Sequence, residues 1–358
     1  MQLQLVLESG RVFQGTGFGA PVEAAGEVVF NTSMTGYQEI ATDPSYAGQI
    51  VCLTAAQIGN YGSTVEDDEA AKPYIEGLIV REFSPIASNW RSQQSCQQYF
   101  ERRGIPVLAD IDTRALVRHL REQGVQRGIL APATGNPESL RARAQAIPRM
   151  DGRDLAREVT TAAAYTWPGA SGAKKRVVAY DFGIKRNILR QLASHGCEVN
   201  VVPAGTTAKD VLAFKPEGVF LSNGPGDPEP CDYAVENIRG LMGRVPIFGI
   251  CLGHQLIGLA LGGKTYKLKF GHHGGNHPVR NPTGAIEITA HNHNFAVDPD
   301  SLPVSEVELT HFDLNDGTLE GLRHRTLPLF SVQYHPEAAP GPHDSHYLFA
   351  DFMKLMER

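Results

Sequence analysis

Apolar and polar positions follow two different periods in the second half of the chain. Short apolar runs, which are typical of buried strands, lie at 176–181, 198–203, 218–222 and 246–250. Segments with helical spacing separate them, at 185–195 and 231–243. In the first of these segments Ile188, Leu189 and Leu192 share one face, and Gly196 marks the end of the helix. Strands that alternate with helices predict a mainly parallel sheet whose two faces are covered by helices.

The first part of the chain has strand-like runs at 3–7, 27–31 and 49–54. A helical pattern covers 112–123, where Leu116, Val117 and Leu120 share a face, and Gly124 is a natural helix stop. Small and polar residues dominate the stretch that follows this region, which is typical of a linker. We therefore expect an α/β chain with an N-terminal domain over 1–150, a linker over 151–173 and a C-terminal domain over 174–358.

The apolar run at 246–250 ends at Cys251, which is flanked by Gly249 and Gly253 and followed by a helical pattern. A nucleophile on a sharp strand-to-helix turn needs small residues on both sides. The start of the helix offers N–H groups and a dipole that favour a thiolate. The pattern predicts Cys251 as a catalytic nucleophile that solvent can reach, at the carboxyl end of a strand, where parallel sheets bind their ligands.

A base with an orienting carboxylate follows another strand-like run, at 330–334. His335 and Glu337 are two residues apart, and such positions point to the same side of an extended chain. The carboxylate can accept a hydrogen bond from one ring nitrogen and turn the other toward the sulfur. Cysteine, histidine and glutamate in this arrangement predict acyl transfer through a thioester. We expect the N–H of Leu252 and the glycine-rich segment 222–228 to stabilise the oxyanion.

Composition excludes several classes of protein. The formal net charge is −6 and the pI is about 6.1, so nothing points to nucleic acid or to an anionic membrane. Five scattered cysteines without a C-x-x-C pair argue against a disulfide framework or a zinc motif and favour the reducing cytoplasm. The uncharged run 245–263 holds glycines and a proline and changes its period midway, which favours a buried strand, turn and helix over a membrane span. The N-terminus lacks the basic start and the long apolar stretch of a signal peptide.

A group of histidines raises the question of a metal site. The segment 270–277 holds three of them, and His291 and His293 follow. Imidazoles bind zinc and nickel well. The spacing matches no helical ligand pair, however, and the segment contains no carboxylate, so we expect structural or interface histidines and no metal. The chain also has no Gly-x-x-x-x-Gly-Lys-Ser/Thr loop for ATP.

Together these motifs resemble two known families. Residues 249–255, 223–228 and 335–337 are similar to the class I, triad-type glutamine amidotransferase domain. The motifs at 30–39, 42–46, 109–114, 180–183 and 271–278 resemble the carbamoyl phosphate synthetase small-subunit family. The second set spans nearly the whole chain. Its N-terminal motifs and the segment 271–278 are specific to that subunit, whereas many amidotransferases share the triad.

The resemblance implies a glutaminase with the triad Cys251, His335 and Glu337. It implies glutamine contacts from Ser45, Gly224, Gly226, Leu252, Gln255, Asn292, Asn294 and Phe295. Ser45 would come from the N-terminal domain, which is specific to the small subunit, so the glutamine site would lie between the domains. The ammonia would pass to a large subunit, which makes carbamoyl phosphate from bicarbonate for arginine and pyrimidine synthesis. ATP and Mg²⁺ would act in that partner, and this chain would need no cofactor, nucleic acid or membrane. A cytoplasmic heterodimer is expected, and assembly of several heterodimers stays open.

Two residues depart from the family pattern, and three other functions stay open. Asn294 stands where glycine is expected, although asparagine tolerates a left-handed backbone, and Tyr334 precedes His335 where glycine is expected. The alternatives are an amidotransferase for another synthetase, such as the anthranilate or guanylate enzymes, a non-catalytic scaffold subunit, and a cysteine peptidase. The N-terminal motifs argue against the first, and the complete triad argues against the second.

Overall fold

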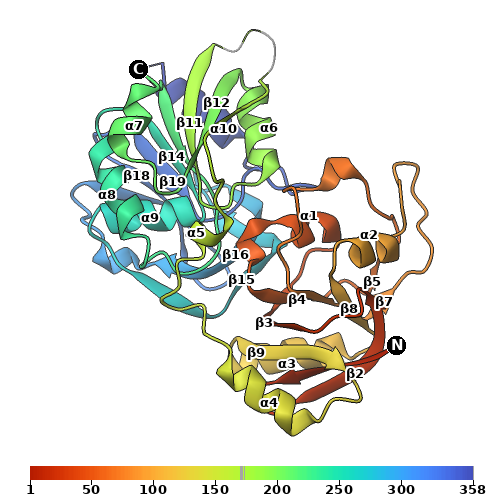
Figure 1. Ribbon diagram of the computed structural model, residues 1–358. Coiled ribbons are helices and arrows are strands. Elements are labelled where there is room, and N and C mark those ends of the chain that lie inside the picture. Colours follow the sequence, from red (N-terminus) through yellow and green to blue (C-terminus); the bar gives the residue numbers. More distant parts are fainter. Residues whose placement is uncertain (170–171, 173, 358) are drawn as a thin grey trace. The chain divides into compact units, whose positions relative to one another are not determined.

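The computed structural model describes residues 1–169, 172 and 174–357 (Figure 1), which form two compact units. Unit 1 comprises Met1–Asp151 and Lys269–Gly274, and unit 2 comprises Gly152–Leu268 and Gly275–Arg358. The stretch expected to be a linker contains a short helix, α5 (Ala156–Val159), and a strand, β10 (Tyr165–Trp167). Residues 170, 171 and 173 of that expected linker lie outside the described residues.

Unit 1 is built around a closed barrel with the strand order β1-β2-β8-β6-β4-β3-β9. The barrel strands are β1 (Gln2–Leu7), β2 (Val12–Gly19), β3 (Ala24–Asn31), β4 (Gln49–Leu53), β6 (Gly77–Ile79), β8 (Pro106–Ala109) and β9 (Gln126–Pro132). The helices are α1 (Tyr37–Thr42), α2 (Cys96–Arg102), α3 (Thr113–Gln123) and α4 (Pro137–Ala146), with the 3₁₀ turns η1 (Pro44–Tyr46) and η2 (Val65–Asp67). A small separate sheet pairs β5 (Gln57–Ile58) with β7 (Glu82–Phe83).

Neighbouring residues of the barrel strands belong to different apolar clusters because successive side chains of a strand point to opposite faces. Val28 packs in the cluster that includes Leu116 and Leu120 of α3, whereas Val29 packs in the cluster that includes Phe100 of α2. The expected face of the 112–123 helix is therefore buried at two of its three predicted positions, and Val117 is half-buried. Asp112 caps this helix by accepting a hydrogen bond from the N–H of Ala115, and Gly124 ends it.

Unit 2 contains a ten-stranded sheet within the described residues, in the order β10-β12-β11-β13-β14-β19-β18-β17-β15-β16. Its strands after β10 are β11 (Lys175–Asp181), β12 (Cys197–Pro203), β13 (Gly218–Leu221), β14 (Ile247–Ile250), β15 (Thr265–Arg280), β16 (Ile286–Val297), β17 (Val307–Asp313), β18 (Leu319–His324) and β19 (Leu329–Val332). Its helices after α5 are α6 (Arg186–Ser194), α7 (Ala208–Ala213), α8 (Asp232–Leu241), α9 (Leu252–Ala260) and α10 (Tyr347–Leu355), with the 3₁₀ turn η3 (Pro299–Ser301).

The centre of this sheet, from β12 to β19, is parallel, and both of its faces are covered. One apolar layer joins the sheet to α7, α8 and α9, and another joins it to α6 and α10 (Figure 1). The expected α/β class with a helix-covered parallel sheet is confirmed. The strands β10, β17 and β18 pair antiparallel at the flanks, a feature that the sequence pattern did not predict.

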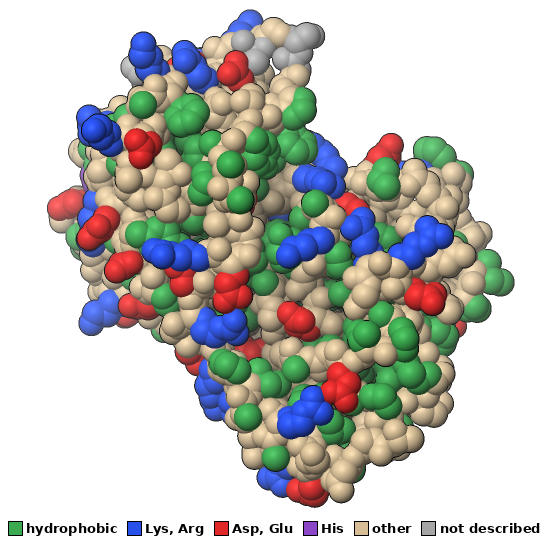
Figure 2. Space-filling view, in the orientation of Figure 1, with side chains coloured by type: hydrophobic (Ala, Val, Ile, Leu, Met, Phe, Trp, Pro, Cys, Tyr) green, Lys and Arg blue, Asp and Glu red, His purple; other side chains and the backbone are tan. Residues whose placement is uncertain are grey.

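Charged side chains of both signs lie on the surface, and the helices are short. Figure 2 shows Lys and Arg side chains interspersed with Asp and Glu over the visible face, without a large basic patch on that face. Within the described part of the chain, every helix is too short or too polar to cross a bilayer. The five cysteines are buried, and none forms a disulfide among the described residues.

Candidate active site

The turn at Cys251, between β14 and α9, has an unusual backbone conformation. Cys251 has φ 55° and ψ −104°, a conformation that an L-residue other than glycine seldom adopts. A Cβ atom on Gly249 would come within 2.9 Å of the Gly253 backbone, and one on Gly253 would come within 2.4 Å of the Leu221 carbonyl oxygen. The two flanking glycines are therefore required by space, as expected for a nucleophile elbow.

A histidine and a glutamate follow the strand next to the elbow. β14 and β19 are parallel neighbours, and the N–H of Cys251 donates to the carbonyl of Val332 at 2.9 Å. His335 follows the end of β19, and its Nδ1 lies 2.8 Å from Oε1 of Glu337. Because the carboxylate accepts a hydrogen from Nδ1, the neutral ring keeps its lone pair on Nε2. The nucleophile and the base thus follow adjacent strands at the same edge of the sheet.

Two neighbouring side chains, Lys185 and His335, keep Glu337 in its ionised form. The side chain of Glu337 is fully buried, and Nζ of Lys185 lies 2.6 Å from its Oε1. Burial by itself would raise the pKa of Glu337, but the Lys185 ammonium and the His335 ring lower that pKa to about 2. Asn187 adds a hydrogen bond from its side-chain amide to the Glu337 carbonyl. Glu337, which orients His335, is therefore a carboxylate at neutral pH and is paired with the Lys185 ammonium.

The sulfur itself makes a different contact from the one expected. Cys251 Sγ donates to the carbonyl oxygen of Asn292 at 3.6 Å, and the residue is only 1% exposed. Among the described residues, His335 Nε2 has no hydrogen-bond partner. The expectation of a solvent-reachable sulfur is therefore not met in this conformation. Catalytic hydrogen bonds are often long in the absence of substrate and shorten in its presence, so this contact is compatible with the triad.

Seven of the eight residues predicted to bind glutamine belong to unit 2, where they lie on three segments. Gly224 and Gly226 follow β13, and a Cβ on Gly224 would meet the Phe182 carbonyl oxygen at 2.3 Å. Leu252 and Gln255 open α9. Asn292, Asn294 and Phe295 lie on β16.

Hydrogen bonds connect these three segments. The Gly253 N–H donates to the Ser222 carbonyl at 3.1 Å, which ties α9 to the segment after β13. Gln255 Nε2 donates to the Phe295 carbonyl at 2.8 Å, which ties α9 to β16. Asn294 does not have a positive φ, so its backbone conformation needs no glycine. The roles of these residues toward glutamine stay predictions.

Ser45 is the one predicted glutamine contact in unit 1. It lies in η1, where its N–H donates to Oδ1 of Asp43 at 2.9 Å, and it is buried. Tyr46 next to it accepts a hydrogen bond from Asn31 at 2.7 Å. The local structure around Ser45 is therefore well fixed within its own unit, and its contact with glutamine stays a prediction.

Sequence reasoning did not identify Lys185 or Asn187 as parts of the site. Both come from the start of α6, far from Glu337 along the chain, so no spacing links them to it. The available signal was the placement of Lys185 shortly after the carboxyl end of β11, the edge at which the other site residues lie. The carbonyl of Asn292 was also missed, because a backbone acceptor leaves no trace in residue identity.

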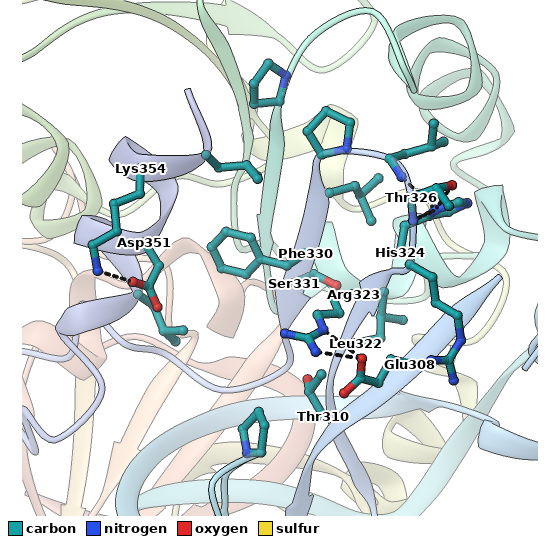
Figure 3. Close-up of a pocket in the computed structure, with 18 of the residues that line it drawn as sticks. Glu308, Thr310, Leu322, Arg323, His324, Thr326, Phe330, Ser331, Asp351 and Lys354 are labelled. Carbon is teal, nitrogen blue, oxygen red and sulfur yellow. Dashed lines mark hydrogen bonds and ion pairs between the residues drawn. The ribbon is translucent and has the colours of Figure 1, made fainter. Parts of the chain in front are cut away.

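Figure 3 shows a pocket of unit 2 that has a volume of about 950 Å³. Its lining includes Val245 and Pro246, which precede β14, and Leu327, which precedes β19. Two ion pairs lie among its lining residues, Arg323 with Glu308 at 2.8 Å and Lys354 with Asp351 at 2.8 Å (Figure 3). Cys251, His335 and Glu337 are not among the residues that line this pocket.

Comparisons with known proteins agree with the arrangement of both units. Residues 178–355 match the family model described as glutamine amidotransferase class-I. Residues 5–130 match the family described as carbamoyl-phosphate synthase small chain, CPSase domain. The carbamoyl phosphate synthase small chain of Syntrophotalea carbinolica is 57% identical, over 100% of this chain and 98% of its own length. Those of Chlorobaculum tepidum and Escherichia coli strain K12 are 58% and 52% identical, each over 99% of this chain and 97% of their own length.

Proposed function

The chain belongs to the carbamoyl phosphate synthase small-chain family, with a class I glutamine amidotransferase domain, and we propose that it hydrolyses L-glutamine to glutamate and ammonia. The observation that carries this proposal is the strained backbone of Cys251 at the end of β14, beside the strand that leads to His335 and Glu337. A cysteine nucleophile and a histidine base that follow adjacent strands at the same edge of the sheet fit nucleophilic attack on an amide. The resemblance stated from the sequence is confirmed at the level of the family.

The reaction we propose proceeds through a γ-glutamyl thioester. The Cys251 thiolate attacks the side-chain amide carbon of glutamine and forms a tetrahedral oxyanion, which backbone N–H groups at Leu252 and in segment 222–228 stabilise. His335 protonates the nitrogen as the C–N bond breaks, and ammonia leaves. His335 then takes a proton from water, which attacks the thioester carbon, and glutamate leaves as the sulfur recovers its electrons. Glu337 orients His335 and stabilises its protonated form.

Membership of a small-chain family implies a large-chain partner. We propose that the large chain consumes the ammonia with bicarbonate and ATP, with Mg²⁺, and makes carbamoyl phosphate for arginine and pyrimidine synthesis in the cytoplasm. No part of the glutaminase reaction needs a cofactor, because the thiol, the imidazole and the carboxylate supply the nucleophile, the base and the orienting group. The eight predicted glutamine contacts, including Ser45, are part of this proposal.

The test is carbamoyl phosphate synthesis by the complex of both chains, with either glutamine or ammonia as the nitrogen source. Cys251→Ser should abolish glutamine-dependent synthesis and leave ammonia-dependent synthesis near the wild-type rate. Cys231→Ser is the matched control, since Cys231 is also buried and also caps a helix, yet has an ordinary negative φ of −89°. That variant should retain both activities. Loss of both activities in a folded Cys251→Ser complex would mean that Cys251 has a structural role instead.

His335→Asn should separate binding from turnover. Without the base, the thioester cannot be hydrolysed efficiently, and general acid–base catalysis typically contributes ~10²–10⁴-fold in rate. We expect glutamine to bind to the variant while glutaminase turnover falls by that order. A glutaminase rate equal to that of the wild type would refute the role given to His335.

A further inference from the structure

A second cluster of reactive side chains lies in unit 2, around the carboxyl half of β16. His291 and His293 are two residues apart on this strand, so they point to the same face, where Glu320 of β18 meets them. Nδ1 of His291 lies 3.2 Å from Nε2 of His293. Oε2 of Glu320 lies 3.6 Å from the first nitrogen, and Oε1 lies 4.0 Å from the second. All three side chains are at most 1% exposed.

The hydrogen bonds of the outer ring nitrogens fix the tautomers of both histidines. The hydroxyl of Thr289 donates its single hydrogen to the His277 carbonyl at 3.0 Å, so it accepts from His291 Nε2 at 2.7 Å. Nδ1 of His293 lies 2.9 Å from the Phe295 carbonyl, which can only accept. In the neutral state, the lone pairs of His291 Nδ1 and His293 Nε2 therefore face one another across 3.2 Å. A cation between them relieves this repulsion.

The distances between the three side chains fit a bound metal ion. The three side chains each offer a ligand atom, and these atoms lie within 4.8 Å of one another. With metal–ligand distances of about 2.0–2.2 Å, a nitrogen–nitrogen separation of 3.2 Å corresponds to a near-tetrahedral angle at zinc. We propose that His291, His293 and Glu320 bind a divalent transition-metal ion of the zinc type.

The surroundings supply the support that metal-binding histidines usually have. The backbone carbonyl of Phe295 and the hydroxyl of Thr289 orient the two rings from behind, as acceptors of the outer N–H groups. The ring of His277 stacks on that of His291 with 4.4 Å between centroids, and its Nδ1 lies 3.0 Å from Oδ2 of the buried Asp313. The carboxylates of Glu320 and Asp313 together match the double charge of the ion.

This proposal departs from the expectation that the histidines are structural and that the chain binds no metal. The expectation rested on helical spacing and on the lack of a carboxylate within the histidine segment. The structure places His291 and His293 on a strand, where a separation of two residues is the one that brings side chains together. The carboxylate comes from another strand, β18, which local spacing cannot reveal.

Metal content of the purified full-length chain tests the proposal directly. The protein is treated with a chelator, dialysed and titrated with Zn²⁺, and a Co²⁺ sample is examined for the visible absorption of a tetrahedral site. We expect one ion per chain by elemental analysis. His291→Gln and Glu320→Gln should each weaken Zn²⁺ binding by at least about tenfold, the scale on which even supporting residues of metal sites act. His119→Gln, a histidine of unit 1 that contacts Ser9, is the matched control and should bind as the wild type does.

Two results would overturn the proposal. One is a chain that retains no Zn²⁺ and shows no tetrahedral Co²⁺ spectrum, with circular dichroism that shows it folded. The other is binding that persists unchanged in both variants and disappears in Cys251→Ser, which would place the ion on the nucleophile. Because the readout is bound metal, failure of the glutaminase proposal would leave this test unaffected.

Discussion

The buried charge cluster around Glu337 allows a quantitative prediction. Oε1 of Glu337 lies 2.8 Å from His335 Nδ1 and 2.6 Å from Lys185 Nζ, and the carboxylate is fully buried. Glu337→Gln keeps the size of the side chain but removes its charge. The Lys185 ammonium, whose side chain is 10% exposed, then stays buried without its counter-charge. Breaking a buried pair in this way typically costs about 3–5 kcal/mol.

The pKa of Glu337 gives a second route to the same magnitude. Burial would raise this pKa, but Lys185 and His335 lower it from 4.5 to about 2. At about 1.4 kcal/mol for each tenfold change in the proton equilibrium, that difference corresponds to about 3 kcal/mol of stability. Both routes give a contribution of about 3 kcal/mol or more to the free energy of unfolding. That is a large part of the 5–15 kcal/mol by which a typical domain is stable.

The sign of the pH dependence follows from the lowered pKa. The stabilisation is complete above the unfolded-state value of 4.5 and is lost as the pH falls from 4.5 toward 2, because the unfolded chain binds the proton first. Between pH 6 and pH 3 the wild type should therefore lose about 2 kcal/mol more stability than Glu337→Gln, which has no proton to bind there. The difference in free energy of unfolding between the wild type and Glu337→Gln should therefore become smaller as the solution becomes more acidic.

Urea denaturation at pH 6 and pH 3 measures this gap. Trp167 packs against the core of unit 2, and a Trp90→Phe background leaves it as the only tryptophan of the chain, so its fluorescence reports the unfolding of that unit. Glu217→Gln is the matched control, because Glu217 pairs with Lys175 at 2.9 Å near the surface, where a pair contributes about 0–1 kcal/mol. Equal costs for the two substitutions, or a gap that does not narrow at pH 3, would refute the reasoning.

Three further predictions concern the packing behind the site. Gly253→Ala would place a methyl group 2.4 Å from the Leu221 carbonyl oxygen and should cost about 1–3 kcal/mol in urea denaturation, whereas Gly205→Ala, with open space around it, should stay within about 0.5 kcal/mol. Burial lowers the pKa of His254 to about 3, so the folded protein keeps this ring neutral and should lose about 2 kcal/mol between pH 6.5 and pH 4.5 as the unfolded chain binds the proton. His254→Gln should flatten that part of the pH profile, and an unchanged profile would contradict the burial argument. Phe352→Ala should cost about 3–5 kcal/mol, because the ring is fully buried with Phe220 and Phe248, and a shift in the urea midpoint of less than a third of that size would show that the core closes around the gap.

The fold of unit 2 could be predicted from the sequence because its signals are local. The strands β11 to β14 are short apolar runs, and the helices between them carry apolar residues at helical spacing. Each element must bury its apolar side, and a parallel sheet with helices on both faces is the arrangement that buries all of them. The predicted bounds therefore differ from the observed ones by a few residues at most, as with β19, which ends at Val332 instead of Tyr334.

The barrel of unit 1 could not be predicted in the same way. β2 contains glycines at 15, 17 and 19, and β6 is only three residues long, so neither shows a clear period of two. Closure of the barrel depends on the pairing of β3 with β9 and of β2 with β8, which are far apart along the chain. Pairing between distant strands leaves no trace in local residue spacing.

The candidate site shows the same division between local and distant information. The positions of Cys251, Gly249 and Gly253 reveal the elbow, and the two-residue spacing of His335 and Glu337 predicts their hydrogen bond, which the structure has. The contact of Lys185 with Glu337, which sets the charge of the pair, joins two elements that no motif connects. Sequence therefore supplied the reacting groups, and the fold supplied the group that controls their charge.

The strain at Cys251 and the alignment of the site have a common cause. A positive φ at a residue other than glycine costs on the order of 1–3 kcal/mol and persists only where neighbouring contacts fix it. Two such contacts are present: the Cys251 N–H donates to Val332, and the Gly253 N–H donates to Ser222. Val332 ends the strand before His335, and Ser222 begins the glycine-rich segment proposed to stabilise the oxyanion. The hydrogen bonds that fix the turn at Cys251 therefore also connect it to the segments that carry the base and the proposed oxyanion donors. A change that relaxed the strain at Cys251 would misalign the sulfur, the base and these donors relative to one another.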